Sequence, residues 1–232
     1  GYKMGNVVAL GGGFDIESAH RWKLAQYLDS LTKKEHPNFL LLPSGFGTYG
    51  EAELERHFAL GCDVDVLLIS RDSEQEVARK IRRADIIYMP GGNSTIPIAM
   101  FRKRECDKYL REAWEETETV LSGKCAGAMF WFEESYDNDA AFDGFEFIHP
   151  LGFIPYCMCP HFDSPEWMPF ENIAHTRKLS SIAIDNGAAI CFLGDKREIF
   201  TVSGKEKVYL FDAKQNYRKI DLTQDAAALA AL

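Results

Sequence analysis

Short runs of apolar residues alternate with longer amphipathic segments through the first half of the chain. The apolar runs cover residues 7–10, 39–42, 64–69, 85–89 and 119–122. The amphipathic segments cover residues 18–35, 51–60, 73–83, 94–102 and 105–116. Short buried strands separated by longer helices are typical of β-α-β units. The pattern therefore predicts an α/β fold with a doubly wound, mostly parallel sheet flanked by helices.

The C-terminal third has a different pattern, in which apolar runs follow one another with little room for helices. These runs cover residues 154–159, 182–184, 188–193, 198–202 and 207–211. Such close spacing predicts antiparallel strands or hairpins. We also expect a helix over residues 170–178, a polar surface loop over 135–144 and a frayed end over 226–232. No repeat or linker divides the chain, which predicts a single α/β domain over residues 1–232.

Composition narrows the classes of function. The chain has 232 residues, of which 46% are hydrophobic, and its formal net charge is -9. Because a surface of that sign repels phosphate backbones and anionic lipids, we expect neither a nucleic-acid nor a membrane partner. No apolar run approaches the ~20 residues of a membrane span, and six cysteines are too sparse for a disulfide scaffold. These features predict a cytoplasmic protein with reduced thiols.

Two glycine-rich turns follow predicted strands. Gly11, Gly12 and Gly13 lack the spacing of a dinucleotide site, and a tight turn at the ligand-binding edge of the sheet is the simpler interpretation. The second turn, Pro90-Gly91-Gly92-Asn93, lets backbone N–H groups approach a substrate. Gly92 is therefore a candidate oxyanion donor, with Gly91 and Asn93 as supporting residues.

Residues 123–127 have the pattern G-x-C-x-G between a predicted strand and a predicted helix. Small residues at Gly123 and Gly127 are what a nucleophile elbow needs, because the helix closes tightly over the strand. The pattern makes Cys125 a candidate nucleophile and the N–H of Ala126 an oxyanion donor. A helix N-terminus is also expected to lower the pKa of the thiol. The alternative is that Cys125 is a small buried residue at a strand end.

A thiol nucleophile needs a base, and only histidines at strand ends are easily directed into a cleft. Four histidines lie in helical, charged surroundings and are expected at the surface: His20, His36, His57 and His175. His149 and His161 both follow apolar runs, and His161 is preferred because its run is longer and Pro160 fixes the approach of the chain. The C-x-C-x-H pattern that ends at His161 lacks a second ligand pair, so we expect no metal and no cofactor.

Four motifs in one order resemble the peptidase E family of aspartyl dipeptidases and cyanophycinase-like hydrolases, which have a class I glutamine amidotransferase-like fold. The motifs are the strand followed by Gly91-Gly92-Asn93, the elbow over residues 123–128, Pro160-His161-Phe162, and the strand over residues 182–188. The resemblance implies hydrolysis of a small peptide or amide through an acyl intermediate. It also implies that Cys125 is the nucleophile, His161 the base and Asn186 the orienting residue.

This chain departs from the family in several positions. The family has Ser at the position of Cys125 and an acid at that of Asn186, but Cys-His-Asn is a working thiol-protease combination. Asp185 is the rival orienting residue. The family's acidic residue after the elbow helix has its nearest counterpart in Asp137 or Asp139, for which a solvated loop is the alternative.

No basic residue follows His161 closely, so a basic or neutral substrate terminus is as plausible as an acidic one. Two alternative functions remain. One is an amidotransferase-like or deglycase-like thiol enzyme, and the other is an inactive homologue that binds a ligand or senses oxidation. The oligomeric state is not predicted.

Overall fold

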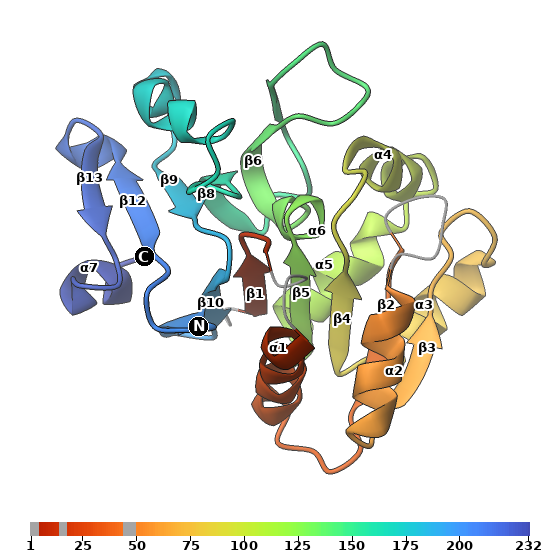
Figure 1. The fold of residues 1–232 in the computed structure, drawn as a ribbon. Coiled ribbons are helices and arrows are strands. Elements are labelled where there is room, and N and C mark those ends of the chain that lie inside the picture. Colours follow the sequence, from red (N-terminus) through yellow and green to blue (C-terminus); the bar gives the residue numbers. More distant parts are fainter. Residues whose placement is uncertain (1–4, 14–17, 44–49) are drawn as a thin grey trace.

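A seven-stranded sheet forms the centre of the protein in a computed structural model, which describes residues 5–13, 18–43 and 50–232 (Figure 1). Its strands are ordered β11-β10-β1-β5-β4-β2-β3. The five parallel members are β1 (Asn6–Leu10), β5 (Val120–Lys124), β4 (Ile86–Met89), β2 (Asn38–Leu41) and β3 (Asp63–Val66). Antiparallel β10 (Ala188–Leu193) and β11 (Lys196–Thr201) extend one edge. The predicted α/β fold is confirmed.

Helices cover both faces of this sheet because side chains of its strands alternate between the faces. Val8 and Leu10 of β1 pack with Leu24 and Leu28 of α1 (Ser18–Leu31). The intervening Ala9 packs instead in the cluster that holds the buried residues of the helices behind the sheet in Figure 1. The remaining long helices are α2 (Glu51–Ala59), α3 (Glu74–Arg83), α4 (Thr95–Lys103) and α5 (Asp107–Glu116).

A second sheet of six strands lies beside the first, in the order β13-β12-β9-β8-β6-β7. Its members are β6 (Phe132–Asp137), β7 (Glu146–Ile148), β8 (Ile154–Cys159), β9 (Ser181–Ile184), β12 (Val208–Asp212) and β13 (Arg218–Asp221). β8 is parallel to both β6 and β9, and the other pairs are antiparallel. The predicted antiparallel hairpins are present, but they are divided between two sheets.

Three local predictions are wrong. The expected loop over 135–144 begins as strand β6, in which Ser135, Tyr136 and Asp137 are buried. The expected helix over 170–178 is replaced by two 3-10 turns, η1 (Met168–Asn172) and η2 (Ala174–Thr176). The expected frayed end contains α7 (Ala226–Ala230), because Asp225 caps it by accepting the Ala228 N–H at 3.0 Å.

Within residues 5–13, 18–43 and 50–232, no helix is both long and apolar enough to cross a bilayer.

Candidate functional site

A pocket of about 450 Å³ opens at the carboxyl edge of the parallel sheet. It lies where β4 and β5 end, which is where open α/β sheets bind ligands. The residues that line it come from the glycine turns, from helices α1 and α2, from the elbow and from the end of β8: Gly13, Arg21, Gly50, Ala52, Glu53, Arg56, Tyr88, Pro90, Gly91, Gly92, Lys124, Cys125 and His161.

Cys125 stands on a strained turn between β5 and the single-turn helix α6 (Ala126–Met129). Its backbone has φ 52° and ψ -112°, which a residue other than glycine rarely adopts. The glycines around it are needed for close packing. A Cβ on Gly123 would lie 2.3 Å from the Gly127 carbonyl oxygen, and one on Gly127 would lie 2.1 Å from that of Met89. The local sequence therefore folds as a nucleophile elbow does.

The thiol of Cys125 is not activated in the way that the sequence predicts. Burial raises its pKa to about 12, although a hydrogen bond from the Ala126 N–H acts to lower it. The negative charge of Asp137 raises the pKa further. The helix dipole is weak because α6 has only four residues. As a residue, Cys125 is nevertheless the one cysteine of the six that is only partly buried.

His161 follows β8 and is also held in a left-handed conformation, with φ 51°. Its backbone N–H donates to the Gly11 carbonyl at 2.9 Å, and its ring packs near Trp167, with 5.5 Å between ring centroids. A Cβ on Gly12 would lie 2.2 Å from the ring carbon Cε1. The triple-glycine turn thus lines the pocket and leaves space for this imidazole.

The predicted contact between His161 and Asn186 is present. His161 Nδ1 and Asn186 Oδ1 are 2.6 Å apart. The amide of Asn186 donates through Nδ2 to Asp163 Oδ1 at 2.7 Å and to Ser164 Oγ at 2.9 Å. Two acceptors on the nitrogen side fix the orientation of the amide, so that its oxygen faces His161. Among the described residues, no hydrogen bond joins the Cys125 sulfur to the His161 ring, although both line the pocket.

Asp163 and Ser164 are residues that sequence reasoning missed. Asp163 also accepts the backbone N–H of Asn186 at 2.8 Å. The signal was a carboxylate two positions after the candidate base. From the sequence alone, Asp163 could be considered only for its effect on substrate charge, because the fold is what brings it into contact with Asn186.

Asp185, the rival orienting residue, is engaged elsewhere. Its Oδ2 accepts the Lys207 N–H at 3.1 Å. Its other oxygen, Oδ1, is buried and has no hydrogen-bond partner among the described residues. Burial, together with the charge of Asp163, raises the pKa of Asp185 to about 6.

The acidic pair after the elbow helix is buried, so the solvated-loop alternative is wrong. Asp137 and Asp139 are 3% and 6% exposed, and both accept from the Ser94 hydroxyl. Burial raises the pKa of Asp137, in spite of its bond with Ser94. Burial also acts on Asp139, but backbone N–H donors, among them Ser94 at 2.9 Å, hold its pKa below the usual value. The pKa values of these two neighbouring carboxylates are thus shifted in opposite directions.

The residues of the glycine turn that supplies the candidate oxyanion donor Gly92 differ in what they do. Gly91 and Gly92 line the pocket, and Gly92 has φ 128°, which favours glycine. Asn93 does not line it. Its Oδ1 accepts the N–H of Ile96 at 2.8 Å and so caps α4.

Cations in the pocket come from residues that the sequence gave no reason to select. Arg21 lies on α1, Arg56 on α2 and Lys124 beside the elbow. Arg56 pairs with Glu53, with 2.5 Å between Nη2 and Oε1. Among the described residues that line the pocket, three are cations and one is an acid, although the chain as a whole has a net charge of -9.

Comparisons with known proteins agree with this fold. The chain is 27% identical over 230 residues to the uncharacterized peptidase YgaJ of Bacillus subtilis, covering 94% of this chain and 97% of that protein. A peptidase from an acI-B1 actinobacterium superimposes with a TM-score of 0.70 at 18% identity, covering 96% and 95% of the two chains. A putative peptidase E protein of Listeria monocytogenes superimposes with a TM-score of 0.67 at 20% sequence identity, covering 86% of this chain and 100% of that chain.

The family assignment rests on more than these pairwise matches. The family model of peptidase family S51 matches residues 7–200. That span contains the elbow, both glycine turns, His161 and Asn186. The chain therefore belongs to peptidase family S51 and is a peptidase E-like hydrolase.

Proposed function

We propose that the chain hydrolyses short peptides with Cys125 as nucleophile, His161 as base and Asn186 as orienting residue. One observation carries the proposal: a cysteine on a strained elbow and a histidine fixed by an amide line the same pocket. Backbone strain at both Cys125 and His161 is typical of functional residues, because a fold keeps such conformations only where its surroundings enforce them.

The hydrogen bond with Asn186 determines how His161 acts. A neutral imidazole that donates its Nδ1 proton to Asn186 Oδ1 leaves Nε2 as an acceptor. Nε2 then takes the thiol proton while the sulfur of Cys125 attacks the substrate carbonyl carbon. The same proton goes to the leaving amine when the C–N bond breaks. Water, deprotonated by His161, then hydrolyses the thioester and regenerates the thiol.

The N–H groups of Ala126 and Gly92 are the proposed oxyanion donors. Each such donor contributes about 3 kcal/mol to lowering the barrier in other hydrolases. Because burial raises the pKa of Cys125 to about 12, the resting nucleophile is the thiol rather than the thiolate. Proton transfer to His161 must therefore accompany the attack, which makes the position of the imidazole decisive.

The charge of the pocket supports a substrate that bears a carboxylate. Arg56 and Arg21 line the pocket, and guanidinium groups match carboxylates in shape and charge. Glu53, paired with Arg56, provides a nearby acceptor for a substrate amine. We therefore propose a short peptide with an acidic group, rather than the basic or neutral terminus that the residues after His161 suggest. Six free cysteines support a cytoplasmic location.

The test is steady-state kinetics on dipeptides that differ only in charge, with wild type, Cys125→Ala and the control Cys106→Ser. Cys106 is buried outside the pocket, and serine keeps its bond to the Arg104 carbonyl. We expect Cys125→Ala to lose at least about 10³-fold in kcat/KM and Cys106→Ser to lose little. Peptidase activity retained in Cys125→Ala would exclude this nucleophile. Ammonia release from glutamine without peptide cleavage would favour the amidotransferase alternative.

Substrate charge is tested separately with Arg56→Gln. If Arg56 binds a substrate carboxylate, this variant raises KM for acidic dipeptides about tenfold or more and changes kcat little. Equal effects on acidic and neutral dipeptides would contradict the charge assignment but leave the nucleophile assignment intact.

A further inference from the structure

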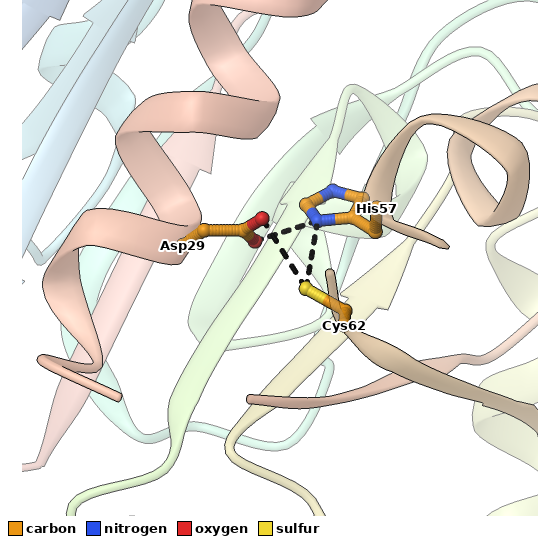
Figure 2. Close-up of side chains that lie close together, drawn as sticks. All are labelled: Asp29, His57 and Cys62. Atoms are coloured by element: carbon orange, nitrogen blue, oxygen red, sulfur yellow. Dashed lines mark hydrogen bonds and ion pairs between the residues drawn. The ribbon is translucent and has the colours of Figure 1, made fainter. Parts of the chain in front are cut away.

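A second group of ionisable side chains lies away from the pocket, between α1, α2 and the turn that leads to β3. This helix cluster consists of Asp29, His57 and Cys62, whose side chains point toward one another in Figure 2. Asp29 Oδ1 lies 2.6 Å from His57 Nδ1, and the Cys62 sulfur lies 3.2 Å from Asp29 Oδ2. The sulfur and His57 Nδ1 are 4.0 Å apart.

The cluster is buried, which corrects the expectation that His57 is a surface residue. His57 is 0% exposed and Cys62 is 3% exposed. The imidazole stacks on Phe39, with 3.8 Å between ring centroids. Its Nε2 is buried without a hydrogen-bond partner among the described residues, so the polar contacts of the ring are all made through Nδ1. Burying three such groups together costs free energy unless their polar atoms form hydrogen bonds or bind a metal.

We infer that the helix cluster is a binding site for a divalent transition-metal ion of the zinc type, held by the Asp29 carboxylate, His57 Nδ1 and the Cys62 thiolate. Nitrogen and sulfur ligands combined with a carboxylate suit zinc, and hard cations such as Mg²⁺ do not accept thiolate. Tetrahedral zinc with ordinary bond lengths sets its ligand atoms about 3.3–3.6 Å apart. The three separations of 2.6, 3.2 and 4.0 Å bracket that range.

Small movements convert the hydrogen-bonded cluster into a ligand set. The contact between Asp29 and His57 has to open, and that between Cys62 and His57 has to close, each by well under 1 Å. Asp29 can make this adjustment because its side chain is 15% exposed, and the same opening admits water as a fourth ligand. On binding, the thiol proton is released, and the neutral imidazole takes the tautomer with its proton on Nε2, so that Nδ1 binds the metal.

Such an ion would link three elements. Asp29 lies on α1, His57 on α2 and Cys62 just before β3. The same two helices place Arg21 and Arg56 in the pocket. The site is therefore structural rather than catalytic. Ligand spacing along the chain gave no hint of it, because Asp29 and Cys62 are 33 positions apart. The expectation of no metal rested on a different pattern, the C-x-C-x-H motif that ends at His161.

The test uses Co²⁺ as the probe metal on chelator-treated full-length protein under reducing conditions. We expect one equivalent to produce an intense thiolate-to-cobalt absorption band and visible bands of tetrahedral strength, and one equivalent of Zn²⁺ to remove them. The bands should be absent in Cys62→Ser and unchanged in Cys125→Ser, which rules out binding at the pocket thiol. The outcome does not depend on peptidase activity, so it is independent of the proposed function.

Loss of the fold in a variant is controlled in two ways. Circular dichroism of metal-free Cys62→Ser must match that of wild type, and Asp29→Asn gives a second variant that keeps the thiol. We expect Asp29→Asn to weaken Co²⁺ binding at least about tenfold, as loss of one ligand or its charge does. Absence of a band in wild type at excess Co²⁺ would overturn the inference. An equal band in folded Cys62→Ser would overturn it as well.

Discussion

Cys125, His161 and Asn186 stand at strand ends, whereas Asp29, His57 and Cys62 stand on two helices and the turn after them. Both groups contain a histidine whose Nδ1 lies 2.6 Å from an oxygen of its partner. Both contain a thiol whose pKa burial raises to about 12. Neither the hydrogen bond nor the thiol pKa therefore distinguishes a candidate catalytic site from a buried cluster.

What differs is backbone strain and access. Cys125 and His161 have φ values of 52° and 51°, and glycines with close contacts surround them. Cys62 and His57 are not among the positive-φ residues of the described chain, and they do not line the pocket that contains Cys125 and His161. Strain directs side chains toward a substrate, whereas helices and ordinary turns bury them. The comparison predicts that equal substitutions in the two regions have opposite effects.

Replacing each histidine by alanine is the largest expected contrast. His161→Ala removes the proposed general base and should lower kcat/KM about 10³-fold with little change in the free energy of unfolding. His57→Ala removes a fully buried ring and should cost about 3 kcal/mol of unfolding free energy. Peptide kinetics and urea unfolding on both variants measure the contrast. A stability loss at His161 as large as that at His57 would remove the distinction.

The two regions also differ in the hydrogen bonds that their carboxylate oxygens accept, and Asp185→Asn tests the consequence of this difference. Asp29 accepts from two donors, but Asp185 Oδ1 has none among the described residues. With a folded pKa of about 6 against 3.8, Asp185 holds its proton more tightly when folded. Its contribution to stability is therefore present at low pH and is lost as the pH rises from about 4 through 6, by about 3 kcal/mol.

In Asp185→Asn that loss is absent, so the stability difference from wild type should grow between pH 4 and pH 6 and then stay constant. Asparagine keeps an acceptor for the Lys207 N–H, which wild type donates at 3.1 Å. Urea unfolding across this pH range measures the difference. A constant difference at all pH values would contradict the raised pKa.

Comparing Gly12→Ala with Gly204→Ala separates the effect of crowding the His161 ring from the effect of backbone strain. Both glycines have positive φ, 122° and 80°. A Cβ on Gly12 would meet the His161 ring at 2.2 Å, but one on Gly204 would meet nothing within 4 Å. We expect Gly12→Ala to displace the imidazole and lower kcat/KM about 10²-fold, and Gly204→Ala to leave it unchanged. Equal kinetics of the two variants would mean that the turn does not position His161.

The sequence predicted the parallel strands and the elbow because their signals are local. Strand periodicity, and small residues at Gly123 and Gly127, are consequences of backbone geometry within a few residues. The candidate residues His161 and Asn186 depended on motif order, and their contact is present. Arg21, Arg56 and Asp163 could not be selected, because their relevance arises from the way distant elements meet. His57 was misplaced for the same reason, since charged neighbours on α2 conceal a buried face.

Asp163→Ala should have the smallest effect on activity, because Asp163 acts only through Asn186. It accepts from the Asn186 amide at 2.7 Å and from its backbone N–H at 2.8 Å. It is itself exposed, so its removal leaves the core intact. Without it, the amide of Asn186 can rotate and present a donor to His161. Losing one charge-assisted bond of this kind corresponds to about a tenfold decrease in kcat.

Because Asp163 is a positioning residue, the decrease should fall on kcat and leave KM unchanged. Asp163→Asn keeps an acceptor for the Asn186 amide and should recover most of the activity, which a purely steric role would not require. The two variants, compared with Asn186→Ala in the same peptide assay, locate the effect. If Asp163→Ala lowers activity in wild type and equally in the Asn186→Ala background, Asp163 acts by a route other than Asn186.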